Sequence, residues 1–178
     1  MLAINIIMRL YVITGGPGSG KTTLLEELGN RRYLIVKEAA KDIILEEQGK
    51  GVKEPWLQTN FQERIVDLQL KRESELLRGN AVVFLDRGIP DGLAYCRFRN
   101  QKVPRNLYLA MKVCDYEKVF LLEKLPNYEK TGFRAEEEED AKKISELIKQ
   151  VYEQLDYEVI VVPPLAVKER SDFVFKHL

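Results

Sequence analysis

The sequence predicts an α/β fold in which helices cover both faces of a five-stranded parallel sheet. Short β-rich runs alternate with longer helical patterns along the whole chain, which is typical of this fold class. Each β-rich run is also too apolar to face water on one side, as expected for strands buried between two layers of helices. The length of 178 residues fits one domain at roughly 100–200 residues per domain, so we expect a single domain over residues 1–178.

The alternation sets the expected ranges of the elements. The predicted strands are Leu10–Thr14, Tyr33–Lys37, Ala81–Leu85, Val119–Leu122 and Val159–Val162. The predicted helices are Gly20–Leu28, Ala39–Gly49, Asn60–Arg78 and Glu136–Leu155. An acidic run at 136–140 lies in the first turn of the last helix, where the helix dipole favours negative charge. We interpret this run as a solvated helix start rather than a metal site.

The charge balance argues against nucleic-acid and membrane partners. The chain has 28 Lys and Arg against 28 Asp and Glu, so no net charge attracts it to a polyanion. The longest apolar stretch, Met1–Ile13, is interrupted by Asn5 and Arg9 and is too short for a membrane span. It also lacks the basic start and cleavage site of a signal peptide. We therefore expect a cytoplasmic protein, and the sequence leaves its oligomeric state open.

Met8 opens the segment MRLYVITGG, and we expect translation to begin there, with the first seven residues as an extension.

The sequence offers few metal ligands of the His and Cys type. Two cysteines, Cys96 and Cys114, and the single His177 are too few for a disulfide framework or a zinc site.

A glycine-rich segment carries the strongest functional signal. It reads GGPGSGKTT and contains the pattern G-x-x-x-x-G-K-T, directly after one predicted strand and before a helix. In such a phosphate-binding loop (P-loop), backbone N–H groups aim at phosphate oxygens, Lys21 reaches the β and γ phosphates, and the Thr22 hydroxyl ligates Mg²⁺. The sequence thus predicts binding of Mg²⁺ and ATP. The expected nucleotide-binding residues are Gly15, Gly16, Pro17, Gly18, Ser19, Gly20, Lys21, Thr22 and Thr23.

The third predicted strand runs into Asp86, where a carboxylate commonly holds Mg²⁺. Hydrolytic motors usually follow this aspartate with a glutamate that polarises water, but here the next residue is Arg87. A cation at this place suits binding of a transferring phosphoryl group or orientation of a carboxylate. The alternative is a salt bridge at the end of the strand.

The second predicted strand also ends next to an acid, Glu38. Because the carboxyl ends of neighbouring parallel strands line one crevice, Glu38 and Asp86 are expected to converge beside the P-loop. A carboxylate there can orient an acceptor hydroxyl and take its proton during phosphoryl transfer, which is a kinase-like arrangement. The alternative is that Glu38 serves only the dipole of the helix that it precedes.

Two loops, Gly49–Trp56 and Leu125–Gly132, are expected to fold over a ligand at this edge, the second within a lid around 125–138. Arg134 in the lid would stabilise the transferring phosphoryl group; alternatively it is solvated and paired with Glu137 or Glu138. A basic cluster would bind a phosphate-bearing acceptor or form a solvated helix face. The cluster consists of Arg97, Arg99, Lys102 and Arg105.

Together these residues resemble the compact AAA-type P-loop ATPase and kinase family related to nicotinamide-riboside kinase and the deoxynucleoside kinases. The resemblance spans most of the chain. It rests on the blocks GGPGSGKTTL, KEAA after the second strand, DRGIPDGLAY at 86–95, GFRAE at 132–136 and VIVVPPLAVKER at 159–170. It implies a kinase-type sheet in the order 2-3-1-4-5, with ATP on the P-loop and an acceptor between the end of the second strand and the helix at Asn60–Arg78.

The resemblance also implies roles for single residues. Glu38 corresponds to the catalytic base of deoxynucleoside kinases, and Arg87 to the arginine of their acid–arginine pair. Gln62 or Gln69 would read the nucleobase. Asp91 and Tyr95 would reach the sugar or lie near it.

We therefore predict an ATP-dependent phosphotransferase with a small nucleoside-like alcohol as acceptor. No N-K-x-D guanine motif occurs, which argues against a GTPase. One alternative is a nucleoside triphosphatase, which would turn over without acceptor. The other is a nucleotide-gated binding protein, which would bind nucleotide without turnover and expose an apolar patch. Candidates for that patch are Trp56, Phe98 and Phe133.

Overall fold

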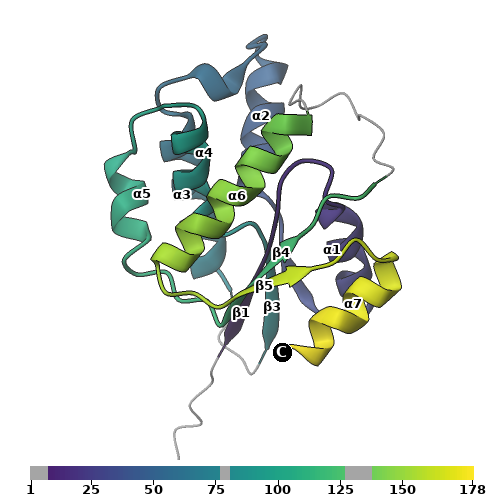
Figure 1. Cartoon of the computed structure of the whole chain (residues 1–178). Coiled ribbons are helices and arrows are strands. Elements are labelled where there is room, and N and C mark those ends of the chain that lie inside the picture. The colour runs from purple at the N-terminus through teal and green to yellow at the C-terminus, as the bar shows by residue number, and fades with distance from the viewer. Residues whose placement is uncertain (1–7, 77–80, 127–137) are drawn as a thin grey trace, which may run out of the picture.

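Five parallel strands form one sheet in the order β2-β3-β1-β4-β5, as predicted (Figure 1). The computed structural model describes residues 8–76, 81–126 and 138–178. The strands are β1 (Arg9–Thr14), β2 (Leu34–Val36), β3 (Val82–Asp86), β4 (Lys118–Leu122) and β5 (Val159–Val162). Because all of them run in the same direction, their carboxyl ends meet at one edge of the sheet.

Helices cover both faces of the sheet, with α1 and α7 on one face and α4 and α6 on the other (Figure 1). The helices are α1 (Lys21–Asn30), α2 (Ala39–Gly49), α3 (Phe61–Ser74), α4 (Asp91–Phe98), α5 (Arg105–Ala110), α6 (Glu138–Gln154) and α7 (Val167–Lys176), with a short 3-10 helix at Pro55–Leu57. Four of these helices match predicted ranges to within a few residues. The prediction did not include α4, α5 or α7.

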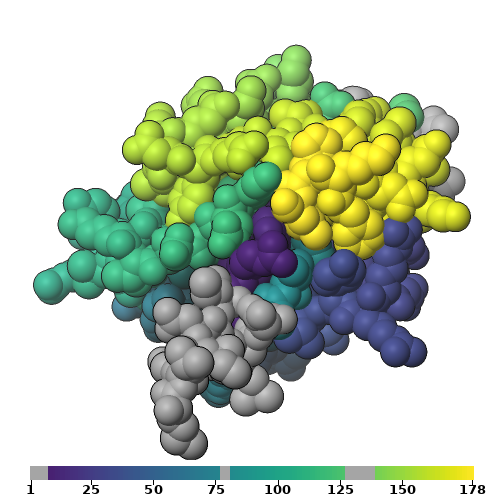
Figure 2. All heavy atoms as spheres, turned by 90° about the horizontal axis from the view of Figure 1, so that it is seen from below, coloured from purple at the N-terminus to yellow at the C-terminus, as the bar shows by residue number. Residues whose placement is uncertain are grey.

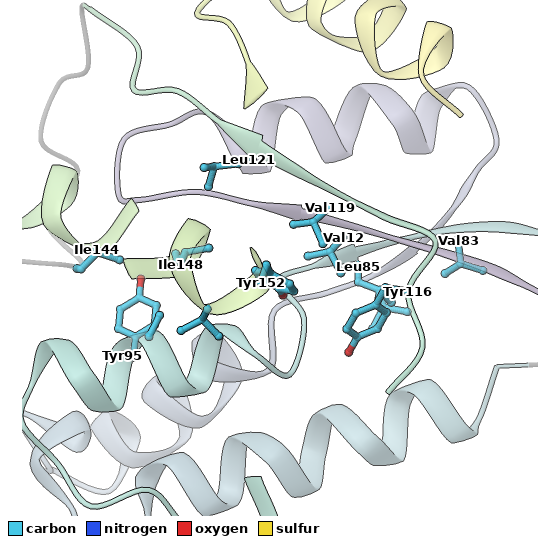
Figure 3. Close-up of a cluster of buried hydrophobic side chains, with 13 residues drawn as sticks. Val12, Val83, Leu85, Tyr95, Tyr116, Val119, Leu121, Ile144, Ile148 and Tyr152 are labelled. Atoms are coloured by element: carbon cyan, nitrogen blue, oxygen red, sulfur yellow. The ribbon is translucent and has the colours of Figure 1, made fainter. Parts of the chain in front are cut away.

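Each strand sends alternate side chains into two separate cores. Val12 of β1 packs with Leu85 and with side chains from α4 and α6, whereas the flanking Tyr11 and Ile13 pack with α1 and α7. Figure 3 shows Ile144, Ile148 and Tyr152 of α6 among the side chains of the first core. The apolar runs of the sequence thus reflect burial on both faces.

The prediction that every strand is too apolar to face water is wrong for the two edge strands. Leu34 of β2 is 50% exposed and Val161 of β5 is 39% exposed. The physical reason is the strand order, because β2 and β5 have a neighbouring strand on one side only.

The candidate site residues follow the carboxyl ends of the strands, not their amino ends. Figure 2 looks at the molecule from below, where the purple start of β1 lies between the yellow helix α7 and the green segment that leads into β4. The residues that follow β1, β2 and β3 lie at the other end. In the part of the chain that the structure describes, no helix combines the length and the apolar character needed to cross a membrane.

Glu47 joins the two helices α2 and α3. Its carboxylate accepts hydrogen bonds from Gln58 (3.0 Å) and Lys50 (2.9 Å) and pairs with Arg64 of α3 (2.8 Å). The hydrogen bond from Gln58, together with those from Lys50 and Arg64, lowers the pKa of Glu47 to about 2 from an ordinary value of 4.5. Since the pKa is lower in the folded state, the ionised carboxylate stabilises the fold above about pH 4.5, and this contribution is lost as the pH falls towards 2.

We predict that Glu47→Gln lowers the urea midpoint of unfolding at neutral pH. The difference from the wild type should shrink as the pH falls from about 4.5 towards 2, because the wild-type carboxyl group is then protonated too. Urea unfolding followed by circular dichroism at several pH values measures this. Glu63→Gln, at an exposed position on α3, is the control. An equal loss at neutral and acidic pH would contradict the assignment.

Candidate functional site

The P-loop connects β1 to α1 at the carboxyl edge of the sheet. Gly16 and Gly20 show two different reasons why the loop needs glycine. A side chain at Gly16 would collide with the carbonyl oxygen of Ala141 in α6. Gly20, the residue before α1, has a φ of 78°, a left-handed conformation that glycine adopts without strain. The predicted segment therefore forms a tight loop that packs against α6 and leads directly into a helix N-terminus.

Lys21 folds back over this loop. Its Nζ donates to the carbonyl oxygens of Gly15 (2.9 Å) and Gly16 (3.0 Å) and to the Ser19 hydroxyl (3.2 Å). The ammonium group is thus held at the centre of the loop, where the sequence pattern predicts phosphate binding. Thr22 and Thr23 follow in the first turn of α1 and are exposed.

Arg170 of α7 is a buried arginine that binds the backbone of the P-loop. Its role was not predicted from the sequence. Arg170 is 2% exposed. Its guanidinium donates to the carbonyl oxygens of Ser19, Glu123 (2.8 Å) and Pro163 (2.9 Å). Burial lowers the pKa of Arg170, against a smaller opposing effect of Glu123. This side chain ties the P-loop to the segments after β4 and β5.

Glu38, which follows β2, and Arg87, which follows β3, lie together beside the P-loop. Arg87 Nε donates to Glu38 Oε1 at 3.0 Å, and Arg87 Nη1 lies 3.3 Å from the carbonyl oxygen of Gly15. Glu38 stands at the N-terminus of α2, but its side chain caps no backbone N–H there. The geometry favours a carboxylate oriented by an arginine over one that serves only the helix dipole.

The guanidinium of Arg87 is buried between two carboxylates, since Nη1 also pairs with Asp91 Oδ1 at 3.0 Å. Burial by itself lowers the pKa of Arg87, but the neighbouring Tyr95, Glu38 and Asp91 raise it well above its ordinary value. Arg87 therefore stays charged. Its Nη2 has no hydrogen-bond partner among the residues that the structure describes, and the side chain lines a cavity.

Asp86 ends β3 directly beside the start of the P-loop, because it is paired in register with Ile13 of β1. The Asp86 carboxylate and the Thr22 hydroxyl offer oxygen ligands, which Mg²⁺ prefers, and Mg²⁺ commonly takes one or two protein ligands together with phosphate oxygens. The residues at this edge thus fit the metal that the P-loop implies. Bound there, Mg²⁺ would neutralise charge on the phosphates.

A cavity of about 250 Å³ opens on the other side of the Glu38–Arg87 pair. Its walls come from α2, α3, α4 and the 3-10 helix. Its polar, charged and aromatic lining includes Glu38, Glu54, Trp56, Gln62, Gln69, Asp86, Arg87, Asp91, Tyr95, Phe98 and Arg99. The predicted acceptor residues therefore share one cavity, next to the phosphate-binding loop.

The structure separates the two glutamines. Gln69 Nε2 donates to Glu73 at 2.7 Å, so this amide is engaged within α3. Gln62 is 6% exposed, and its Oε1 has no hydrogen-bond partner among the described residues. A buried amide oxygen without a partner costs free energy unless a ligand supplies one. Gln62 is therefore the better candidate for reading an acceptor.

Asp91 and Tyr95 also line the cavity, but in different ways. The Asp91 carboxylate already accepts hydrogen bonds from Thr14, Arg87 and Tyr152. The Arg87 guanidinium carbon lies over the Tyr95 ring, 5.1 Å from the centroid of the ring. Asp91 is thus engaged by the protein, whereas Tyr95 contributes a ring to the wall.

The predicted basic cluster is divided. Among its members only Arg99 lines the cavity, with its guanidinium over Trp56 and Tyr95. Arg97 donates to Gln154 on the surface, and the other two members, Lys102 and Arg105, are exposed.

Part of the predicted lid and patch lies outside the described residues. This is the case for Arg134, Phe133 and most of the lid at 125–138. Of the expected apolar patch, Trp56 and Phe98 line the cavity rather than a separate surface. The first predicted loop, Gly49–Trp56, contributes Glu54 and Trp56 to the cavity wall.

Several solved structures share the fold of this chain. The kinase-like structures include NadR in complex with NR (TM-score 0.67, 19% identity, 87% of this chain and 45% of that chain). They also include thymidylate kinase from Ehrlichia chaffeensis (TM-score 0.69, 13% identity, 96% of this chain and 98% of that chain). A third is deoxyadenosine kinase from M. mycoides (TM-score 0.66, 18% identity, 94% of this chain and 97% of that chain). This chain spans less than half the length of NadR. At these identities the likeness shows the fold.

No curated protein sequence matches the chain. The sequence pattern of one family, described as an AAA domain, matches residues 10–170. That match covers the P-loop, the ends of β2 and β3, and Arg170. The chain therefore belongs to this AAA domain family, and its fold is that of the P-loop nucleoside and nucleotide kinases.

Proposed function

We propose that the protein is an Mg²⁺-dependent kinase that transfers the γ-phosphoryl group of ATP to an alcohol of a small nucleoside-like acceptor. The observation that carries this proposal is the Glu38–Arg87 pair, 3.0 Å apart, between the P-loop and the cavity. In this proposal residues 1–178 form one kinase domain, with a lid around 125–138 that includes Arg134.

ATP would occupy the P-loop. Lys21 would turn from its carbonyl partners, Gly15 and Gly16, to the β and γ phosphates, and Thr22 and Asp86 would hold Mg²⁺. The fixed guanidinium of Arg170 keeps the loop in place without contacting the nucleotide.

The acceptor would occupy the cavity with its hydroxyl group against Glu38. In the transfer step the hydroxyl proton moves to the Glu38 carboxylate, the hydroxyl oxygen bonds to the γ-phosphorus, and the bond to ADP breaks. Arg87 has two tasks. It orients Glu38 through Nε, and its Nη2 is a donor for an oxygen of acceptor or phosphate.

The charges of the cavity favour an acceptor that carries no phosphate. Apart from Asp86, which would hold Mg²⁺, the described lining residues include three carboxylates (Glu38, Glu54 and Asp91) against two guanidinium groups (Arg87 and Arg99). Arg87 is already paired with two of these carboxylates. A phosphomonoester would bring about −1.5 to −2 further charges into a negative site. We therefore infer a neutral or cationic alcohol.

The proposal is tested with a panel of nucleosides, nucleoside monophosphates and vitamins. Trp56 is the only tryptophan in the sequence and lies in the cavity wall, so its fluorescence reports acceptor binding. ADP formation from Mg·ATP should rise on addition of an unphosphorylated acceptor. ADP formation that no acceptor increases would favour the triphosphatase alternative, and binding without turnover would favour the nucleotide-gated binding protein.

We predict that Lys21→Ala weakens ATP binding by roughly 10- to 100-fold, because a charge-assisted contact to phosphate is lost. Calorimetric titration with a non-hydrolysable ATP analogue measures this. Lys142→Ala, at an exposed position near the loop, is the matched control. Unchanged affinity in Lys21→Ala would refute phosphate binding by this lysine.

We predict that Glu38→Gln lowers acceptor-dependent turnover by roughly 100-fold or more while ATP affinity stays within about twofold. The amide keeps the size of the side chain but cannot take a proton. Glu54→Gln, which removes a carboxylate from the same cavity without touching Arg87, should change turnover little. If Glu38→Gln lost ATP affinity and turnover equally, Glu38 would be structural.

We predict that Gln62→Leu raises the acceptor KM by roughly tenfold or more and leaves the KM for ATP unchanged, because a hydrogen bond to the acceptor is lost. Gln69→Leu is the comparison, since Gln69 is engaged by Glu73. It should lower the melting temperature rather than raise the acceptor KM. Steady-state kinetics with the acceptor found in the panel distinguish the two, and the reverse pattern would contradict the assignment.

A further inference from the structure

The Asp91 side chain accepts four hydrogen bonds next to the site. It is 3% exposed. Its Oδ1 accepts from Thr14 Oγ1 (2.5 Å) and Arg87 Nη1 (3.0 Å), and its Oδ2 accepts from the backbone N–H of Gly88 (3.2 Å) and from Tyr152 Oη (2.6 Å). The four donors come from β1, the segment after β3, and α6. Asp91 therefore joins three separate parts of the chain at the Arg87 guanidinium.

Tyr152 is the donor that comes from farthest along the sequence. It is fully buried on α6, and Figure 3 shows its ring in the core beside the strands. Burial raises the pKa of Tyr152 well above its ordinary value, and the neighbouring Asp91 carboxylate adds to this effect. The hydroxyl group therefore keeps its proton and donates. It also lies against Gly88, where an added Cβ would be 2.5 Å from the hydroxyl oxygen.

The orientation of Arg87 depends on where its two carboxylate partners stand. Glu38 fixes Nε and Asp91 fixes Nη1. Glu38 is partly exposed at the cavity, whereas Asp91 is buried and held on both oxygens. The rigid end of this arrangement is thus Asp91. Without the Tyr152 hydroxyl, Oδ2 would keep only the longer bond from Gly88, and the carboxylate could rotate away from Arg87.

We propose that Tyr152 is a positioning residue, which acts through Asp91 to hold the Arg87 guanidinium where it orients Glu38. This inference rests on the proposed function for its kinetic consequence, but not for its structural one. It also connects α6 to the site at two points. The helix meets the P-loop where Ala141 lies against Gly16, and it meets the Glu38–Arg87 pair through Tyr152.

The chain provides a matched control, Tyr157. Its ring contacts the Tyr152 ring, with centroids 5.7 Å apart, and its hydroxyl donates to the carbonyl oxygen of Cys114 at 2.9 Å. Tyr157→Phe therefore removes a hydrogen-bonded hydroxyl from the same aromatic group without touching Asp91. If the Tyr152 hydroxyl had a purely structural role, Tyr152→Phe and Tyr157→Phe would have the same kinetic constants.

The first measurement is the kinetics of acceptor-dependent phosphoryl transfer. Tyr152→Phe should lower kcat by about tenfold and leave the KM for ATP within about twofold, whereas Tyr157→Phe should leave both unchanged. Thr14→Val, which removes another hydrogen bond to Asp91, should also lower kcat. This variant provides the test if Tyr152→Phe does not fold. Equal kinetics in the two tyrosine variants, or no loss in Thr14→Val, would overturn the proposal.

The second measurement does not need activity. The Arg87 Nε–H signal in a ¹⁵N spectrum, assigned with Arg87→Lys, should exchange slowly with water in the wild type and in Tyr157→Phe. In Tyr152→Phe it should exchange at least about tenfold faster, because the pairing with Glu38 opens more often. Unchanged exchange would overturn the inference. If the wild type shows no acceptor-dependent turnover but the exchange rates differ as expected, only the proposed function is refuted.

Discussion

The buried guanidinium of Arg87 is the group on which the geometry of the site depends. Removing such a charge from water costs several kcal/mol, and only close pairing offsets this cost. Arg87 has two carboxylate partners, Glu38 and Asp91, each at 3.0 Å. Its backbone adopts a left-handed conformation with a φ of 69°, and its N–H bonds to the carbonyl oxygen of Ile13 at 3.1 Å. The end of β3 is therefore fixed against β1 just before the P-loop.

The Glu38–Arg87 pair lies between the phosphate-binding loop and the cavity. On one side, the P-loop with Lys21 and the oxygen ligands of Thr22 and Asp86 suit a polyphosphate and its metal. On the other side, the cavity is rich in aromatic rings and carboxylates. Glu38 lies at the boundary between the two, where under the proposed function it would take the proton of the acceptor hydroxyl group. Under the same proposal, the carboxylates of the cavity wall would disfavour an acceptor that already carries a phosphate.

The sequence predicted the parts of this site that follow from local pattern and parallel topology. The P-loop is a contiguous motif, and Glu38 and Asp86 follow neighbouring strands, so the sheet alone brings them together. Arg170 and Tyr152 could not be predicted, because their partners are backbone carbonyls or a carboxylate 61 residues away. Helices α4 and α5, with 8 and 6 residues, are too short for their periodicity to be recognised. Exposure of the edge strands depends on strand order, which periodicity does not determine.

The most direct test of the central claim is a crystal structure with a bisubstrate analogue that links adenosine to the acceptor through a polyphosphate chain. The account predicts phosphates in the P-loop under Lys21 and the acceptor moiety in the cavity. It also predicts a Glu38 carboxylate oxygen within about 2.6–3.2 Å of the atom that represents the acceptor oxygen, with Arg87 still paired to Glu38. A structure in which Glu38 points away from that atom, or in which the acceptor moiety lies outside the cavity, would contradict the account.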